Sequence, residues 1–170
     1  MGGFNNTKKN KFLKTLPQSG VETSDIAARC KFNFSFFDAS QPAGQDFCDW
    51  DSHTGLNSLA TLLNKVKDYT KEPLSYWRTQ RIGGGGLKVL AYYGKFPKKS
   101  DFTLPAHVPH DVSWARFRLG NKVRLIGFVI PEKFSNKDYD HESKKYFFDC
   151  NTFYVVFLDR DHAFYKTEQK

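Results

Sequence analysis

The chain has 170 residues and a mass of 19.6 kDa, which places it in the size range of one domain. Apolar residues make up only 39% of it, but seventeen Phe, eight Tyr and three Trp can bury enough area to exclude disorder throughout. The formal charge is +8, and residues 71–124 account for it, because they carry eleven bases and three acids. A basic surface of this kind binds phosphate groups or an acidic protein, or else is a solvated face without a partner.

The sequence has neither the apolar run of a membrane-spanning helix nor the apolar core of a signal peptide, so we expect a cytoplasmic protein without a membrane partner. The cysteines Cys30, Cys48 and Cys150 are widely spaced, which argues against a disulfide framework and against a zinc cluster. The glycine run 83–86 lacks the lysine of a nucleotide-binding loop. We therefore expect no metal and no other cofactor.

The N-terminal segment predicts an arm that precedes the folded domain. Residues 1–29 show no sustained period and predict a mobile arm, and residues 30–170 predict a single α+β domain. The alternation of apolar and polar residues over 32–36 is typical of a half-buried strand. Residues 38–55 are rich in turn-forming residues and predict a loop.

Two helices are expected after this loop. Apolar residues recur at intervals of three and four from Leu56, which predicts a helix over residues 55–69 with Thr54 as its cap. Pro73 can occupy a first helical turn, and the apolar spacing that follows predicts a second, shorter helix over 73–81.

The remaining half of the domain predicts strands. Side chains alternate in polarity over 87–92, and three prolines then predict an ordered but irregular segment over 94–111. β-branched and aromatic residues predict strands at 112–119, 123–130 and 153–158.

The first two of these strands should form an antiparallel hairpin about Gly120-Asn121, while the charged segment 131–149 predicts a protruding loop. The order of elements predicts an α+β fold in which an antiparallel sheet carries two helices on one face.

Arginines gather on one face of the predicted hairpin. Side chains alternate along a strand, so Arg116 and Arg118 share a face, and Arg124 opens the next strand across the turn. Guanidinium groups held close together repel one another unless an anion lies among them, and their fork of donors fits phosphate. The other residues predicted to bind phosphate are Lys122, Arg78 and Arg81. The alternative is that the arginines pair within the chain with Asp111, Asp159 or Asp161.

His162 and Tyr165 follow the last predicted strand. A histidine titrates near neutral pH and can transfer a proton, and a tyrosine can stack on a base or orient a phosphate. His162 can equally be a structural residue that is hydrogen-bonded near aspartates.

The segments 117–128, 153–158 and 161–165 resemble the C-terminal half of RelE/ParE-type bacterial toxins. Those chains have an arginine strand, a short turn, Arg-Leu with apolar residues, a further apolar strand and a terminal group of His, Arg or Tyr. Their order of one strand, two helices and an antiparallel sheet is similar to the order predicted above. This chain is longer, with its N-terminal arm and with insertions at 94–111 and 131–149.

The resemblance implies a RelE-like fold and an endoribonuclease that cuts messenger RNA on the ribosome without a metal, held inactive by an acidic antitoxin. It implies that Arg124 contacts the scissile phosphate and that His162 or Tyr165 is the terminal acid/base and base-stacking group. Arg116 and Arg118 match less constrained basic positions. Catalysis would proceed by attack of a ribose 2′-hydroxyl.

Two other functions fit the same residues. One is a non-catalytic module of a defence or regulatory system that binds nucleic acid or an acidic protein. The other is a ParE-like inhibitor of a topoisomerase, which would use the same fold without a ribonuclease site.

Overall fold

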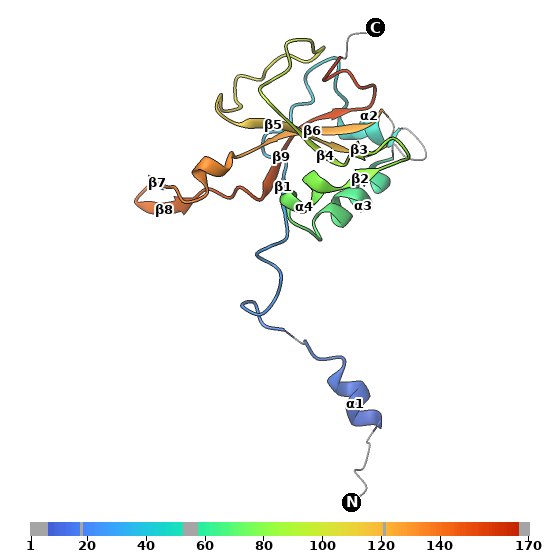
Figure 1. The fold of residues 1–170 in the computed structure, drawn as a ribbon, viewed down its shortest axis with the longest axis vertical. Coiled ribbons are helices and arrows are strands. Elements are labelled where there is room, and N and C mark those ends of the chain that lie inside the picture. Colours follow the sequence, from blue (N-terminus) through green and yellow to red (C-terminus); the bar gives the residue numbers. More distant parts are fainter. Residues whose placement is uncertain (1–6, 18, 53–57, 121, 167–170) are drawn as a thin grey trace, which may run out of the picture.

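The computed structural model of the chain describes residues 7–17, 19–52, 58–120 and 122–166. Its centre is a five-stranded sheet in the order β1-β9-β6-β5-β4 (Figure 1). The strands are β1 (Lys31–Asn33), β4 (Leu90–Gly94), β5 (Ser113–Arg118), β6 (Arg124–Val129) and β9 (Thr152–Asp159). Neighbouring strands are antiparallel except β1 and β9, which run parallel.

The fold is therefore α+β, as the order of elements predicted, but the prediction of an antiparallel sheet was wrong. The sheet is mixed because β1 joins its edge beside β9, with Phe32 opposite Phe153. β1 is also shorter than the predicted 32–36. The side chain of Asn33 accepts a hydrogen bond from the N–H of Ser35 at 2.8 Å, and this turn ends the strand.

Four helices are present in the described chain: α1 (Thr7–Leu13), α2 (Phe47–Asp51), α3 (Leu59–Tyr69) and α4 (Leu74–Thr79). α3 and α4 fall within the two predicted helices. Ser58 caps α3, accepting the N–H of Thr61 at 3.2 Å, and the predicted cap Thr54 lies outside the described residues. α2 interrupts the predicted loop 38–55, because Asp46 and Asp49 form a capping box that starts a helical turn.

Helices cover one face of the sheet and irregular chain covers the other (Figure 1). On the helical face, Trp50, Leu62 and Leu74 from α2, α3 and α4 pack in one buried cluster with sheet residues such as Phe117. On the opposite face, Phe102 and Phe164 come from the irregular chain. With Trp114, Ile126, Phe128 and Phe157 of the sheet they form a second buried cluster. The predicted irregular segment 94–111 thus serves as the cover of a sheet face.

Two small hairpins extend from this body. β2 (Arg81–Ile82) pairs with β3 (Leu87–Lys88), and β7 (Asp138–His141) pairs with β8 (Lys144–Phe147). The second hairpin and a short 3-10 helix, Glu132–Phe134, occupy the segment predicted as a protruding loop. The segment does protrude (Figure 1), but it is a paired ribbon carrying exposed aromatic side chains.

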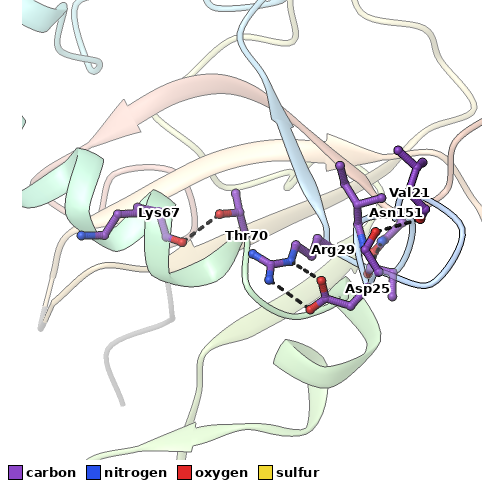
Figure 2. A network of polar contacts seen from close by, with 9 residues as sticks. Val21, Asp25, Arg29, Lys67, Thr70 and Asn151 are labelled. Atoms are coloured by element: carbon purple, nitrogen blue, oxygen red, sulfur yellow. Dashed lines mark hydrogen bonds and ion pairs between the residues drawn. The ribbon is translucent and has the colours of Figure 1, made fainter. Parts of the chain in front are cut away.

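The arm carries α1 at its far end, away from the sheet (Figure 1). Residues 20–29, between α1 and β1, form consecutive turns. Figure 2 shows Arg29 and Asp25 as an ion pair, with a distance of 3.0 Å from Nε to Oδ1. Asn151 attaches this segment to the domain by donating to the carbonyl of Ala28 at 2.8 Å. None of the helices in the described residues is long and apolar enough to cross a membrane.

Candidate nucleic-acid interface

The sheet register brings charged side chains into one row at the end of the sheet. Arg118 of β5 lies directly opposite Arg124 of β6, and Arg124 lies opposite Asp159 of β9. Arg116 is two residues before Arg118 on β5 and therefore projects from the same face. The hairpin prediction that the three arginines share a face is consistent with this register. That face, however, is basic only at this end, because its other end is the apolar cluster of Trp114 and Phe128.

The arginines differ in burial and in their hydrogen bonds. Arg124 is buried, and its Nη1 donates to the carbonyls of Gly120 at 3.0 Å and Val123 at 2.9 Å. Arg118 is also buried. Arg116 is only half-buried; its Nε donates to the Tyr93 hydroxyl at 3.1 Å and its Nη1 donates to the Lys88 carbonyl at 3.2 Å. Of the three, Arg116 is thus the one that solvent can reach.

The cluster holds positive charge in a poorly solvated place. Burial lowers the pKa of Arg124 to about 10, and the nearby positive charges of Arg118 and Arg116 lower it further. Burial likewise lowers the pKa of Arg118. Even so, a pKa near 10 leaves the Arg124 guanidinium protonated at neutral pH. Such a cluster stabilises an anion because each bound negative charge relieves the mutual repulsion.

The alternative that carboxylates already neutralise these arginines is only partly met. Within the described chain, no carboxylate oxygen lies within 4.0 Å of the guanidinium nitrogens of Arg116 or Arg124. Asp159 attracts Arg124 through space, but its two oxygens accept the N–H groups of Ala163 at 2.8 Å and Phe164 at 3.0 Å. Asp161 instead pairs with Arg160 at 3.5 Å.

The turn that Asp159 holds places His162 beside the arginines. His162 has a φ of 63°, in the left-handed region that few side chains adopt. Burial lowers the pKa of His162, and the positive charge of Arg124 lowers it further. The imidazole is therefore uncharged at neutral pH and can accept a proton. Burial raises the pKa of Asp159, although its two amide donors act in the opposite direction.

An aromatic pair borders the cluster. The rings of Tyr93 and Tyr165 stack with centroids 5.1 Å apart and an angle of 7° between planes. Tyr165 is exposed, whereas Tyr93 is half-buried and its hydroxyl accepts the hydrogen bond from Arg116. The outer face of Tyr165 can therefore stack on a base next to a phosphate bound at Arg116.

The remaining predicted phosphate-binding residues fall in different places. Lys122 is exposed in the turn that leads into β6. Arg81 is exposed and lies opposite Lys88, whose carbonyl contacts Arg116, so Arg81 flanks the cluster. Arg78 does not belong to it. Its guanidinium lies 4.5 Å from the ring centre of Tyr92, on the helical side of the sheet, and 3.9 Å from Glu132.

Sequence reasoning missed Tyr93 and assigned Asp159 only as a possible neutraliser. Tyr93 faces the cluster because the pairing of β4 with β5 shifts between Tyr92 and Gly94, which alternation alone does not reveal. Asp159 could have been suspected from its place at the end of a strong strand, three residues before His162.

The arrangement as a whole can bind a phosphodiester and move one proton. Arg116, backed by the two buried arginines, can neutralise phosphate oxygens, and His162 can accept a proton. No group of three or more His, Cys, Asp or Glu side chains in the described residues could hold a metal ion. Comparison of the chain with models of protein families, with curated proteins and with solved structures found no match.

Proposed function

We propose that this protein is a metal-independent endoribonuclease that binds RNA at the cluster of Arg116, Arg118, Arg124 and His162. The observation that carries the proposal is the convergence of three guanidinium groups and one uncharged imidazole beside a carboxylate whose oxygens already accept backbone N–H groups. The similarity to RelE/ParE-type toxins supports the same reading. It also makes ribosome-bound messenger RNA the proposed substrate and an acidic antitoxin the proposed partner.

The proposed reaction needs no group beyond the RNA and the side chains. The 2′-oxygen attacks the adjacent phosphorus while His162 takes the 2′-hydroxyl proton. The bond from phosphorus to the 5′-oxygen breaks, and the imidazolium returns a proton to that oxygen. The products are a 2′,3′-cyclic phosphate and a 5′-hydroxyl. Arginine charge stabilises the negative charge that develops on the phosphorus oxygens.

Burial modifies the roles that the family resemblance assigned. Arg124 engages two backbone carbonyls from a buried position, so we assign it to the field behind the phosphate. Arg116 is the arginine assigned to direct contact. Tyr165 is assigned to stacking on the base, since its ring is exposed beside Arg116's partner Tyr93.

Replacing Arg116 with alanine should lower the rate of RNA cleavage about 100-fold, because one charged donor to the developing negative charge is lost. The assay measures cleavage of free RNA and of ribosome-bound messenger RNA in the presence of EDTA, with product ends identified by mass spectrometry. Lys65→Ala is the control, because Lys65 is an exposed cation on α3. Intact RNA with the wild-type protein in both assays, or equal rates for Arg116→Ala and wild type, would contradict the proposal.

Replacing His162 with asparagine should lower the cleavage rate by about 10²- to 10⁴-fold and leave RNA affinity within a few-fold of wild type. Asparagine tolerates the left-handed backbone, so the turn is kept while the proton acceptor is lost. Because the pKa of His162 lies below its ordinary value, the wild-type rate should stay level at neutral pH and fall only in more acid solution. A wild-type acid limb that persists unchanged in His162→Asn would remove His162 from the mechanism.

RNA binding without cleavage is the second candidate. The burial of Arg118 and Arg124 favours it, because it leaves Arg116 and His162 as the groups accessible beside Tyr165. Affinity that falls steeply with salt, with a logarithmic slope of about −0.7 per phosphate contacted, together with intact RNA, would identify this function.

A further inference from the structure

We infer that the arm helix α1 of one chain docks into an aromatic groove on a second copy of the chain. The groove lies between the β7–β8 hairpin and the sheet, at the opposite end of β6 from Arg124. Its volume is about 450 Å³. Six rings that line it are Phe36, Phe128, Phe134, Tyr139, Tyr146 and Phe148. The inference does not depend on the proposed ribonuclease activity.

The groove has the composition of a binding surface. Phe147 at its border is 72% exposed, and Tyr139 and Tyr146 are also exposed, although all three are paired into a hairpin that protrudes from the domain. Aromatic side chains are enriched at protein interfaces and depleted from exposed surfaces without a partner. An unoccupied aromatic groove therefore indicates a ligand with apolar side chains.

The charge of the groove selects a cationic ligand. Asp111 and Asp149 are its only charged lining residues in the described chain. The aromatic faces also accept cations, since the ammonium groups of Lys133 and Lys137 lie 5.0 and 5.2 Å from the ring centre of Phe134. Nucleic acid does not fit this lining, because its phosphates would meet two carboxylates.

The arm has the complementary features. Four lysines and no acid occur in residues 7–16. Phe12 and Leu13 at the end of α1 and Leu16 in the next turn are 62%, 45% and 43% exposed. Spacings of one and four residues place these three side chains on one side of the helix. The arm thus presents an apolar stripe among lysines, which matches an aromatic groove lined by carboxylates.

The segment that joins α1 to the domain argues for a second copy as the partner. Residues 20–29 form the consecutive turns of Figure 2, and the contacts of Ala28 with Asn151 and of Cys30 with Glu72 hold the last of them to the domain. This segment directs α1 away from its own sheet (Figure 1). The arm would have to lose these turns to reach the groove of the same chain. Two copies that exchange arms form a closed, two-fold dimer.

Sedimentation equilibrium of the full chain tests this inference. We expect a wild-type species of twice 19.6 kDa. Phe12→Asp with Leu16→Asp in the arm, or Phe147→Asp in the groove, should each raise the dimer dissociation constant at least about tenfold. The controls are Val21→Asp, at an arm residue that is 80% exposed but outside α1, and Ile82→Asp on the other hairpin.

Mixing the variants tests the exchange itself. The arm double variant and the groove variant should form a mixed dimer when combined, because one intact arm then meets one intact groove. A monomeric wild type at all concentrations, including one in which α1 docks on its own chain, would overturn the inference. A dimer that all variants leave unchanged would also overturn it.

Discussion

Replacing Gly127 with alanine is expected to unfold most of the protein. Gly127 is in the middle of β6, where the pairing with β9 shifts and the backbone of β9 bulges toward it. A Cβ at this position would overlap the carbonyl oxygen of Tyr154 and would lie 2.8 Å from Cε1 of Phe153. Both neighbours belong to the central strand of the sheet and have no room to move. We expect a loss of at least about 4 kcal/mol in the free energy of unfolding, comparable with the whole stability of many domains.

Thermal melting followed by circular dichroism measures this effect, together with the yield of soluble protein. Gly84→Ala is the matched control, because Gly84 lies in the β2–β3 hairpin and has nothing within 4 Å of the added Cβ. A Gly127→Ala protein that melts within a few degrees of wild type would show that β6 and β9 do not approach as described.

Replacing Asp159 with alanine should destabilise the protein by about 3 kcal/mol. The buried carboxylate accepts the N–H groups of Ala163 and Phe164, and its removal leaves two buried donors without acceptors. It also removes the negative charge that lies opposite Arg124, which leaves the arginine cluster less compensated. Loss of the turn should in addition release His162 from its left-handed conformation.

Urea unfolding of the full chain measures the stability change. Asp161→Ala is the control, because the Asp161 side chain is 67% exposed and pairs only with its neighbour Arg160 at the protein surface. The histidine resonances in NMR spectra report the turn separately. Equal unfolding midpoints for the two variants would mean that Asp159 does not hold the turn.

Sequence periodicity predicted the elements of this fold better than their assembly. α3, α4, β5, β6 and β9 lie where apolar spacing and β propensity placed them, because each pattern reflects one buried face. The parallel pairing of β1 with β9 could not be predicted in this way. Its partners Phe32 and Phe153 are far apart in the sequence, and a strand pattern does not specify which neighbour it will meet.

The candidate site was predictable as far as local geometry determined it. Alternation along β5 and the short turn placed Arg116, Arg118 and Arg124 on one face, and the register agrees. The burial of Arg118 and Arg124 was not predictable, because it depends on the irregular chain that covers this face. Arg78 was grouped with them on charge alone, and its place on α4 puts it on the helical side.

The position of β9 has a consequence for how the protein matures. β9 lies between β1 and β6, so the first strand has no neighbour in the sheet until residues 152–159 have left the ribosome. Helices formed earlier in synthesis must wait for it, with their apolar faces exposed to chaperones and proteases. Asp159 and His162 emerge at the same late stage. A chain still being translated therefore has neither a finished core nor an assembled cationic cluster, and any action on RNA begins only once the polypeptide has been released.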